Sequence, residues 1–329
     1  MPEQIARGYK TQCVLDFEES FGTAPSTPAG KILPINSFGL NVSRNKNSAE
    51  TLTGRRDPVE PFDGNVEVTG DIVVPVDLRA FPYWLKLLMG APTTTGTDDP
   101  ESPGTDIAPF THVFKVSDTT PSGILQCQFG TNPLSYGLFN GAKVSSLSLS
   151  VGGDEELTAT FSVAGRNATY STTNYDSNAS SVTLKRLNNF QAILKKNGTK
   201  FATVTKFDLT IDNGLDTSIR TIGGEGMVYD IPEGIMSVTG TMTALFTGLD
   251  LIEEAKNSTE MSLEIGVELD SNNSFKILLP EVQSQYQGPT VEGATGITVD
   301  FPFVAYFNDD VSNNSCVVIT VKNDVASYA

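Results

Sequence analysis

The sequence predicts a mainly β protein, a β-sandwich or barrel with a flanking short α-helix, in which one structural unit occurs twice. The first observation behind this prediction is the stretch 66–76, where apolar residues hold the even positions and Glu67, Thr69 and Asp71 hold odd ones. A period of two is typical of a half-buried β-strand. The second observation is that this stretch returns 170 residues later, where Thr239 and Thr241 take the polar positions.

Other segments of the first copy also have counterparts in the second. The stretch 38–42 is matched by 207–211, which carries Asp208 between two apolar residues, and a strand expected at 157–163 is matched at 297–303. An amphipathic helix predicted at 81–90 is matched at 248–256 by a shorter, more acidic segment with good helix propensity. We therefore expect both copies to place a short helix between strands.

The repeat and the composition of the loops divide the chain into five parts. We expect a proline-containing N-terminal arm at 1–37, with strand-like sequence starting at Phe38, and a first sandwich unit at 38–165. A polar linker at 166–200, a second sandwich unit at 201–307 and a C-terminal arm with one strand at 308–329 complete the chain. Within the first unit, we expect an acidic loop at 92–108 and a hairpin turn at Gly152-Gly153.

Two long polar loops, 43–65 and 212–235, occupy matching positions in the two copies. Loops of this length are uncommon in compact domains unless they are functional or disordered. Their equal lengths favour a shared role, for which an extended hairpin that docks on a neighbour would be suitable. The first loop carries a group of charged residues, namely Arg55, Arg56, Asp57 and Glu60.

The net charge of −17 argues against a protein that binds nucleic acid by neutralising phosphates, because such proteins need an excess of Lys and Arg. No apolar run reaches the roughly 18 residues of a membrane helix, so no membrane partner is predicted. The N-terminus lacks the basic start and apolar core of a signal peptide. We expect the protein to stay in the cytosol unless it leaves as part of an assembly.

The sequence offers little catalytic chemistry. The only histidine, His112, has no carboxylate or nucleophile close to it in sequence, and we interpret it as a strand residue. The three cysteines lie too far apart for a metal or redox motif, and Cys127 is expected in the core. Trp84, the only tryptophan, is interpreted as a packing residue of the predicted helix. We predict no enzyme activity, no cofactor and no metal site.

Two alternatives stay open at this point. A carbohydrate-active enzyme would need two facing carboxylates in a deep pocket, and 39 Asp and Glu residues always offer pairs. A bacterial surface or fimbrial β-sandwich that acts as a binding module would need secretion, against which the missing signal peptide argues.

Several segments, taken in order, resemble phage tail tube proteins. The longest is 64–92, Gly-Asn-Val-Glu-Val-Thr-Gly-Asp-Ile-Val-Val-Pro-Val-Asp-Leu-Arg-Ala-Phe-Pro-Tyr-Trp-Leu-Lys-Leu-Leu-Met-Gly-Ala-Pro, and the others are 17–25, 111–115 and 143–151. The likeness covers most of 8–165 and, more weakly, the second half. Its specificity lies in the order of the segments, since none of them is diagnostic alone.

The resemblance implies a β-sandwich that closes into rings by sheet-edge pairing and stacks into a hollow tube. Such tubes usually contain six single-unit subunits in each ring. Because this chain carries two units, we expect a trimeric ring with pseudo-sixfold symmetry. The resemblance further implies a virion tail component that assembles in the bacterial host cytoplasm. Its implied partners are other copies of itself, the tape measure, the tail terminator and the baseplate or tail-tip proteins, while genomic DNA passes through without specific binding.

The resemblance also suggests roles for two sets of residues. If the repeated strands line the tube, their polar positions face an acidic lumen, which repels phosphates. The candidates for this lumen are Glu67, Thr69, Asp71, Asp208, Thr239 and Thr241. The long loop of each unit reaches the next ring in this family, so the candidates for contacts between rings are Arg55, Arg56, Asp57 and Glu60.

Overall fold

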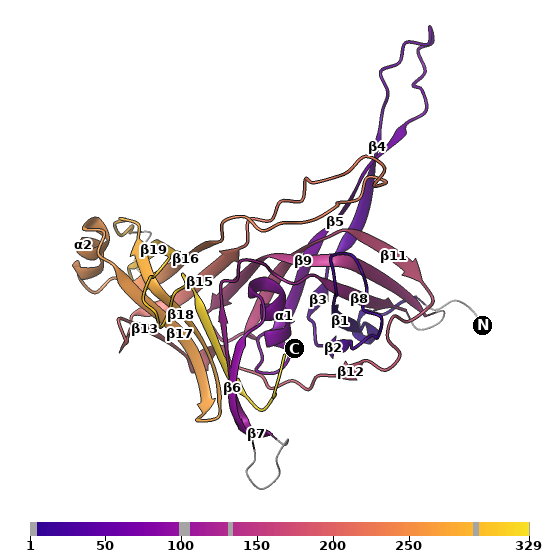
Figure 1. The fold of residues 1–329 in the computed structure, drawn as a ribbon. Coiled ribbons are helices and arrows are strands. Elements are labelled where there is room, and N and C mark those ends of the chain that lie inside the picture. The colour runs from indigo at the N-terminus through magenta and orange to yellow at the C-terminus, as the bar shows by residue number, and fades with distance from the viewer. Residues whose placement is uncertain (1–4, 99–105, 131–133, 292–295, 329) are drawn as a thin grey trace.

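The computed structural model describes residues 5–98, 106–130, 134–291 and 296–328, and it confirms a mainly β fold with short helices (Figure 1). The helices are α1 (Phe81–Met89) and α2 (Asp250–Lys256), with single 3-10 turns at Gly8–Lys10 and Asn189–Gln191. The strands are, in chain order, β1 (Cys13–Phe17), β2 (Lys31–Leu33), β3 (Ser37–Phe38), β4 (Asn41–Asn47), β5 (Phe62–Pro75), β6 (Thr93–Asp98), β7 (Asp106–Lys115), β8 (Gly123–Phe129), β9 (Ser135–Val151), β10 (Thr158–Gly165), β11 (Asn167–Ser171), β12 (Ser180–Ser181), β13 (Ala192–Lys196), β14 (Thr199–Lys200), β15 (Val204–Asp212), β16 (Ser237–Leu245), β17 (Met261–Asp270), β18 (Asn273–Ser284), β19 (Thr298–Tyr306) and β20 (Val318–Asn323).

One antiparallel sheet runs through both copies of the repeat. In the first copy, β3 and β4 pair with β5, β5 pairs with β10, and β10 pairs with β9. In the second copy, β15 pairs with β16 and β16 pairs with β19. Strand β9 also pairs with β15, so the sheets of the two copies join edge to edge.

The strand register confirms the internal repeat. In the first copy Ile72 lies opposite Phe38 on one side and Phe161 on the other. In the second copy Met242 lies in the same way between Phe207 and Phe301. Phe207 and Met242 follow Phe38 and Ile72 at the spacing of the sequence repeat, whereas the strand of Phe301 follows that of Phe161 at a shorter spacing, and the two copies share one strand arrangement.

The repeated Val-Thr-Gly triplet contains a glycine because the neighbouring backbone lies too close for a side chain. A Cβ atom on Gly70 would overlap the carbonyl oxygen of Gly39, and a Cβ atom on Gly240 would overlap that of Asp208. Gly39 and Asp208 are themselves equivalent positions of the repeat. Both copies therefore bring two strands closer than a side chain would allow.

The remaining strands form further layers around the core. The first half of β9 leaves the shared sheet and pairs with β8 and β11, while β8 also pairs with β1. Strand β18 pairs with β17 over most of its length, its first half also pairs with β20, and β17 also pairs with β13. Strand β20 in turn pairs with β7, which pairs with β6. Strands β9 and β18 thus each belong to two layers.

The two predicted arms and the linker contain more structure than their sequences indicated. Strand β1 lies between β2 and β8, so the expectation that strand sequence starts at Phe38 is wrong. In β1, Cys13 and Leu15 are fully buried, which the nearby prolines do not prevent because they lie outside the short strand. The predicted strand of the C-terminal arm exists as β20, but it is enclosed between β7 and β18. Within the predicted linker, β11 and β13 pair with β9 and β17.

Helix α1 fits its predicted bounds and is almost completely buried. The Asp77 carboxylate accepts hydrogen bonds from the backbone N–H groups of Ala80 and Phe81, at 3.0 and 2.8 Å, and so satisfies two free donors at the helix N-terminus. Gly90 ends the helix with a φ of 93°. Helix α2 confirms the helix predicted in the second copy, but among its residues only Ala255 is buried.

One hydrophobic core extends across both copies. The ring of Trp84 stacks on Phe161 with centroids 5.5 Å apart, and Phe81 meets Phe275 of β18 edge-on at 5.7 Å. Trp84 is fully buried and Cys127 is buried as well, as the sequence predicted. The units joined by the β9–β15 pairing therefore also share buried side chains.

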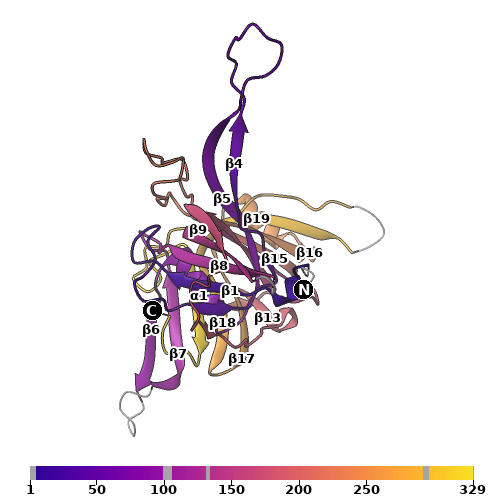
Figure 2. The ribbon, with the colours of Figure 1, turned by 90° about the vertical axis from the view of Figure 1, so that its right-hand side faces the viewer.

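Two hairpins project from opposite ends of the molecule. The β4–β5 hairpin extends far beyond the body, and the β6–β7 hairpin points the other way (Figures 1 and 2). Strand β4 ends at Asn47 and β5 begins at Phe62. The loop expected at 43–65 is therefore shorter and lies at 48–61. The acidic loop expected at 92–108 is flanked by β6 and β7, and its centre, 99–105, lies outside the described residues. Gly152-Gly153 joins β9 to β10 as predicted.

Candidate assembly surfaces

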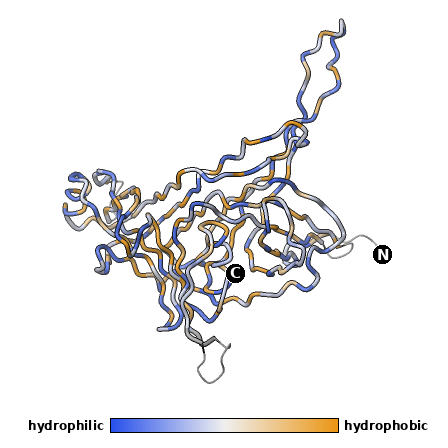
Figure 3. The backbone as a smooth tube through the Cα atoms, viewed as in Figure 1, coloured by the Kyte–Doolittle hydropathy of each residue, from blue (hydrophilic) through white to orange (hydrophobic). Residues whose placement is uncertain are grey.

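The polar positions of β5 form one exposed row of side chains. Glu67, Thr69 and Asp71 are exposed, whereas Val68 and Ile72, which follow Glu67 and Asp71 in the strand, are buried at 2% and 0% exposure. The alternation of hydrophilic and hydrophobic residues can be followed along the strands in Figure 3. The predicted period of two is therefore present, with the carboxylates on the outer face of the sheet.

The same face continues into the second copy. Asp71 lies opposite Ser162, Ser162 opposite Ser146, and Ser146 opposite Asp212. Residues directly opposite each other in a sheet lie on the same face. This row therefore crosses from β5 to β15 without changing face, and it ends in a carboxylate at both ends.

The candidates from the second copy, Asp208, Thr239 and Thr241, lie on this face as well. Asp208 is the register partner of Thr241, and Thr239 is the partner of Thr210, two residues further along β15. All three are partly exposed. The structure thus brings the six candidate residues together on one surface, which we call the polar sheet face.

Hydrogen bonds within the polar sheet face link neighbouring strands. The Ser162 hydroxyl donates to Asp71 at 2.7 Å, and the Thr243 hydroxyl donates to Asp300 of β19 at 2.6 Å. The ammonium group of Lys206 donates to Asp208 at 2.8 Å. These three carboxylates are thus held in place, while they stay accessible to solvent.

The charged residues of the first long loop lie on the projecting hairpin. Arg55, Arg56, Asp57 and Glu60 are all exposed in its loop, and Arg55 forms an ion pair with Asp57 at 2.5 Å. The exposed Leu52 lies in the same loop at 98% exposure. Within the described residues, this loop forms no hydrogen bond or ion pair with any other part of the chain.

The second long loop is not free, because it folds onto the first copy of the same chain. The backbone N–H of Val66 donates to the carbonyl oxygen of Gly226 at 2.9 Å, and the Arg44 guanidinium donates to that of Glu225. Val228 and Ile231 pack against Ala164. In Figure 1 this loop runs from β15 and β16 to the base of the β4–β5 hairpin. The sequence predicts that such a loop docks on a neighbour, and in the second copy that neighbour is the first copy of the same chain.

A mostly buried ion pair holds this loop in place, and the sequence analysis missed it. The Lys143 ammonium lies 2.8 Å from the Glu233 carboxylate, and both side chains are at most 15% exposed. Thr120 donates to the same carboxylate through its backbone N–H and its hydroxyl. Burial opposes ionisation of Glu233, but Lys143 and Thr120 outweigh it and lower the pKa of this carboxyl. In the sequence, Glu233-Gly234 matches Asp63-Gly64 of the first copy, a pattern that predicts a turn and not an ion pair.

His112 lies in β7, as predicted, and is completely buried. Its Nε2 lies 2.9 Å from the carbonyl oxygen of Val325 and 3.2 Å from the amide oxygen of Asn323. Both partners only accept, so Nε2 carries the proton and Nδ1 accepts from the Thr94 hydroxyl at 2.8 Å. Burial lowers the pKa of His112 against the opposing effect of these hydrogen bonds. The histidine therefore joins β7 to the segment after β20.

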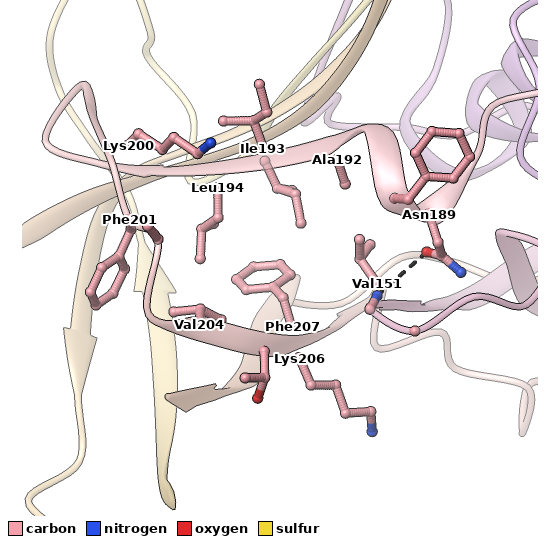
Figure 4. A pocket seen from close by; sticks show the side chains of 16 residues that line it. Val151, Asn189, Ala192, Ile193, Leu194, Lys200, Phe201, Val204, Lys206 and Phe207 are labelled. Atoms are coloured by element: carbon pink, nitrogen blue, oxygen red, sulfur yellow. Dashed lines mark hydrogen bonds between the residues drawn. The ribbon is translucent and has the colours of Figure 1, made fainter. Parts of the chain in front are cut away.

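The pockets of the described residues bear on the enzyme alternative. Figure 4 shows one of about 320 Å³ between the β13–β14 hairpin and β15, where Phe207 and Leu194 point into the space and Asn189 accepts a hydrogen bond from Gly152. None of the residues that line it is acidic. A second pocket of about 400 Å³ takes both of its carboxylates, Asp250 and Glu254, from one turn of α2. Neither pocket places two carboxylates on facing walls, which is the arrangement that a glycoside hydrolase needs.

The described residues contain neither a candidate metal site nor a helix that could cross a membrane. No group of three His, Cys, Asp or Glu side chains in these parts of the chain is placed to hold a metal ion. Neither α1 nor α2, the α-helices in the same parts, has the length and apolar character needed to cross a membrane.

Comparison with protein families gives a match to the family described as phage tail tube protein, over residues 8–305. No curated protein matches the chain.

Proposed function

The chain belongs to the phage tail tube protein family, and we propose that three copies of it form each ring of a hollow tail tube. The ring has pseudo-sixfold symmetry, because each chain contributes two copies of the repeated unit. The rings stack through the projecting hairpins and leave an axial channel for genomic DNA. The protein is a component of the virion tail and assembles in the cytoplasm of the host.

The observation that carries this proposal is the edge-to-edge junction between the copies. Strands β9 and β15 pair over six residues each, and the polar sheet face crosses the junction without interruption. A sheet that continues across every junction of a ring leaves no exposed edges around its circumference. Head-to-tail contacts of this type close into rings, and stacked rings give an open-ended tube.

In this ring the polar sheet face lines the channel. Glu67, Asp71 and Asp208 place carboxylates on it, and Thr69, Thr239 and Thr241 add neutral hydroxyls. Carboxylates repel the phosphates of DNA within a Debye length of about 8–10 Å, so the DNA passes without being bound. The excess of acidic residues in the whole chain supports the same role.

The hairpin loop at 48–61 makes the contacts between rings, through Arg55, Arg56, Asp57 and Glu60. Its length, its distance from the body and its charged, exposed residues support this role (Figure 2). At the ends of the tube we expect the tape measure, the tail terminator and the baseplate or tail-tip proteins as partners, since a tube of defined length must start and stop on other components.

Electron microscopy of the purified chain tests the proposal. We expect hollow rods, formed either spontaneously or on an added tube initiator, with three chains in each cross-section. A cross-section with six chains would overturn the trimeric ring, and a channel lined by basic residues would overturn the acidic lumen. Isolated globules under both conditions would count against the tube itself.

A further inference from the structure

The β9–β15 junction joins the strand at the sheet edge of the first copy to the first strand of the second copy. In this junction Phe207 lies opposite Val151, Leu209 opposite Leu149, and Ile211 opposite Leu147. The three residues from β15 are all at most 2% exposed. The chain therefore contains, inside itself, one complete example of how two copies of the unit join.

The first copy presents the strand edge that is equivalent to β15. Phe38 and Val42 lie opposite Ile72 and Val68 of β5, as Phe207 and Ile211 lie opposite the corresponding residues of β16. Within the described residues, β3 and β4 form strand ladders with β5 only. Phe38 and Val42 are only half-buried, unlike their counterparts. This edge, residues 37–43, lacks the neighbour that β15 has.

The second copy presents the other half of the junction. Strand β18 pairs with β19 from Glu281 to Ser284, and Ser284 lies opposite Phe303. After Gln285, whose N–H donates to Pro302, the segment 285–291 separates from β19. In the first copy the corresponding part of β9 stays paired with β10. The separated segment is exposed, with Tyr286 at 64%, and a groove of about 370 Å³ lies between it and β19.

We propose that residues 37–43 pair with residues 285–291 of a second copy of this chain, in the arrangement of β15 on β9. This inference rests on the proposed function and names the surfaces that close the ring. Continuing the β18–β19 register places Tyr286 opposite Phe301, the position that Leu147 holds opposite Phe161. Val42 is the counterpart of Ile211, so Val42 of one chain lies opposite Tyr286 of the next.

The composition of both edges fits surfaces that pair only in the assembly. Arg44 and Lys46 lie in β4, directly after the edge 37–43, and charged side chains on an edge strand oppose unspecific pairing. Pro289 interrupts the other edge, and proline occurs in sheets mainly at edges and bulges because it has no N–H to donate. The isolated chain is thus protected from open-ended aggregation, while one specific register stays possible.

Disulfide trapping tests the pairing. Residues opposite each other in antiparallel strands have Cα atoms about 4.5–5.5 Å apart, a distance that a disulfide can bridge. The variant carries Val42→Cys and Tyr286→Cys together with Cys316→Ser, which removes the cysteine that is not fully buried. The matched control carries Val42→Cys, Val311→Cys and Cys316→Ser, since Val311 is exposed at 93% but lies on neither edge. Diamide serves as the oxidant.

We expect the Val42/Tyr286 variant to give disulfide-linked dimers and trimers on a non-reducing gel, with a ladder that ends at the trimer. The adjacent thiols have an effective concentration in the millimolar range, so the linked species should exceed those of the control about tenfold or more. Tubes in the electron microscope without this excess would overturn the pairing and leave the tail tube function standing. A ladder ending at the trimer without tubes would support the pairing and count against the tube. Absence of both would overturn both.

A charge variant provides a second test that needs no cross-link. Tyr286→Asp places a carboxylate in the proposed junction but changes only an exposed side chain of the isolated chain. We expect an unchanged circular dichroism spectrum and a loss of rings in analytical ultracentrifugation. The control Val311→Asp should keep the rings. Normal ring formation by Tyr286→Asp would contradict the proposed register.

Discussion

Asp208 of β15 lies opposite Ser150 of β9, on the strand pair where the two copies of the repeat meet. The same Asp208 lies opposite Thr241 of β16, so this carboxylate sits in the middle of a sheet that extends into both copies. Its position explains how a polar period found in two distant stretches of sequence becomes one continuous surface. The predictions below test the contacts that hold this arrangement together.

The close approach of β15 and β16 should make Gly240 intolerant of a side chain. In Gly240→Ala the new Cβ would overlap the Asp208 carbonyl and approach the Phe303 ring, so the strands must move apart. We expect a loss of about 2 kcal/mol in the free energy of unfolding, measured by urea denaturation. Gly248→Ala is the control, because a Cβ there meets no atom within 4 Å and should change stability little. Equal stability of the two variants would contradict the close approach.

The shared core should depend on the stack of Trp84 and Phe161. Phe161→Ala removes a fully buried ring and leaves a cavity, for which we expect a loss of about 3–5 kcal/mol. Unfolding can be followed by fluorescence, since Trp84 is the only tryptophan. Phe190→Ala, at a position 79% exposed, should cost less than about 0.5 kcal/mol. A small effect of Phe161→Ala would mean that the stack is not part of a packed core.

The ion pair of Glu233 should make the docking of the second loop pH-dependent. A carboxyl whose pKa is lowered by folding stabilises the fold above its ordinary pKa of 4.5 and loses this contribution as the pH falls through the folded value. Glu233→Gln should therefore lower the free energy of unfolding by about 2 kcal/mol at pH 7, and the difference from the wild type should shrink below pH 4.5. Urea denaturation at several pH values measures both.

The control for this variant is Asp63→Asn, which removes the matching acid of the first copy. Asp63 pairs with Lys46 on the exposed hairpin, where solvent screens the interaction. We expect a clearly smaller change than in Glu233→Gln. A loss of stability in Glu233→Gln that stays constant down to pH 3 would show that the charge of Glu233 is not what stabilises the loop.

His112 should titrate below the ordinary pKa of 6.5, because its burial disfavours the imidazolium. Only one histidine is present, so a single set of ring resonances in ¹H–¹⁵N NMR reports its pKa and its tautomer. We expect the Nε2–H tautomer at neutral pH, and a contribution to stability that is lost as the pH falls through the folded pKa. The urea-unfolded chain provides the reference value. A folded pKa above 6.5 would contradict the burial of this ring.

The projecting hairpin should be needed for stacking and not for folding. In Arg55→Glu/Arg56→Glu the reversed charges repel the surface that the loop contacts, so we expect short tubes or single rings in electron micrographs, with an unchanged circular dichroism spectrum. Arg7→Glu/Lys10→Glu makes the same change of net charge at exposed residues of the first 3-10 turn, outside the hairpin, and should leave tube length unchanged. Normal tube length in the hairpin variant would remove these two arginines from the contact between rings.

Much of the strand arrangement could be predicted from local patterns. The alternation around Glu67 and Asp71 gave β5, the repeat gave β16, and the spacing of apolar residues gave α1, because each pattern depends on residues close together in sequence. The repeat also anticipated that the two copies share a register, which the partners of Ile72 and Met242 confirm.

Contacts between distant segments could not be read in the same way. The first half of β9 is an example, because glycines such as Gly137 and Gly141 are typical of turns. In the structure that half is extended, and Gly141 adopts a φ of 65° within it. The pairing of β9 with β15, and the contact of Glu233 with Lys143, are set by the packing of whole units. Sequence spacing contains no information on such contacts.

The folding of the second long loop onto its own chain has a consequence for how such a tube would fit together. In each chain the second long loop packs on the chain itself, and only the first projects outward. A ring of three chains would then present three projecting hairpins to the next ring, although its circumference is divided into six nearly equal units. Successive rings would fit together only in orientations that differ by a third of a turn. A rotation by one sixth of a turn would place each hairpin against the other copy of the repeated unit, which has a different surface.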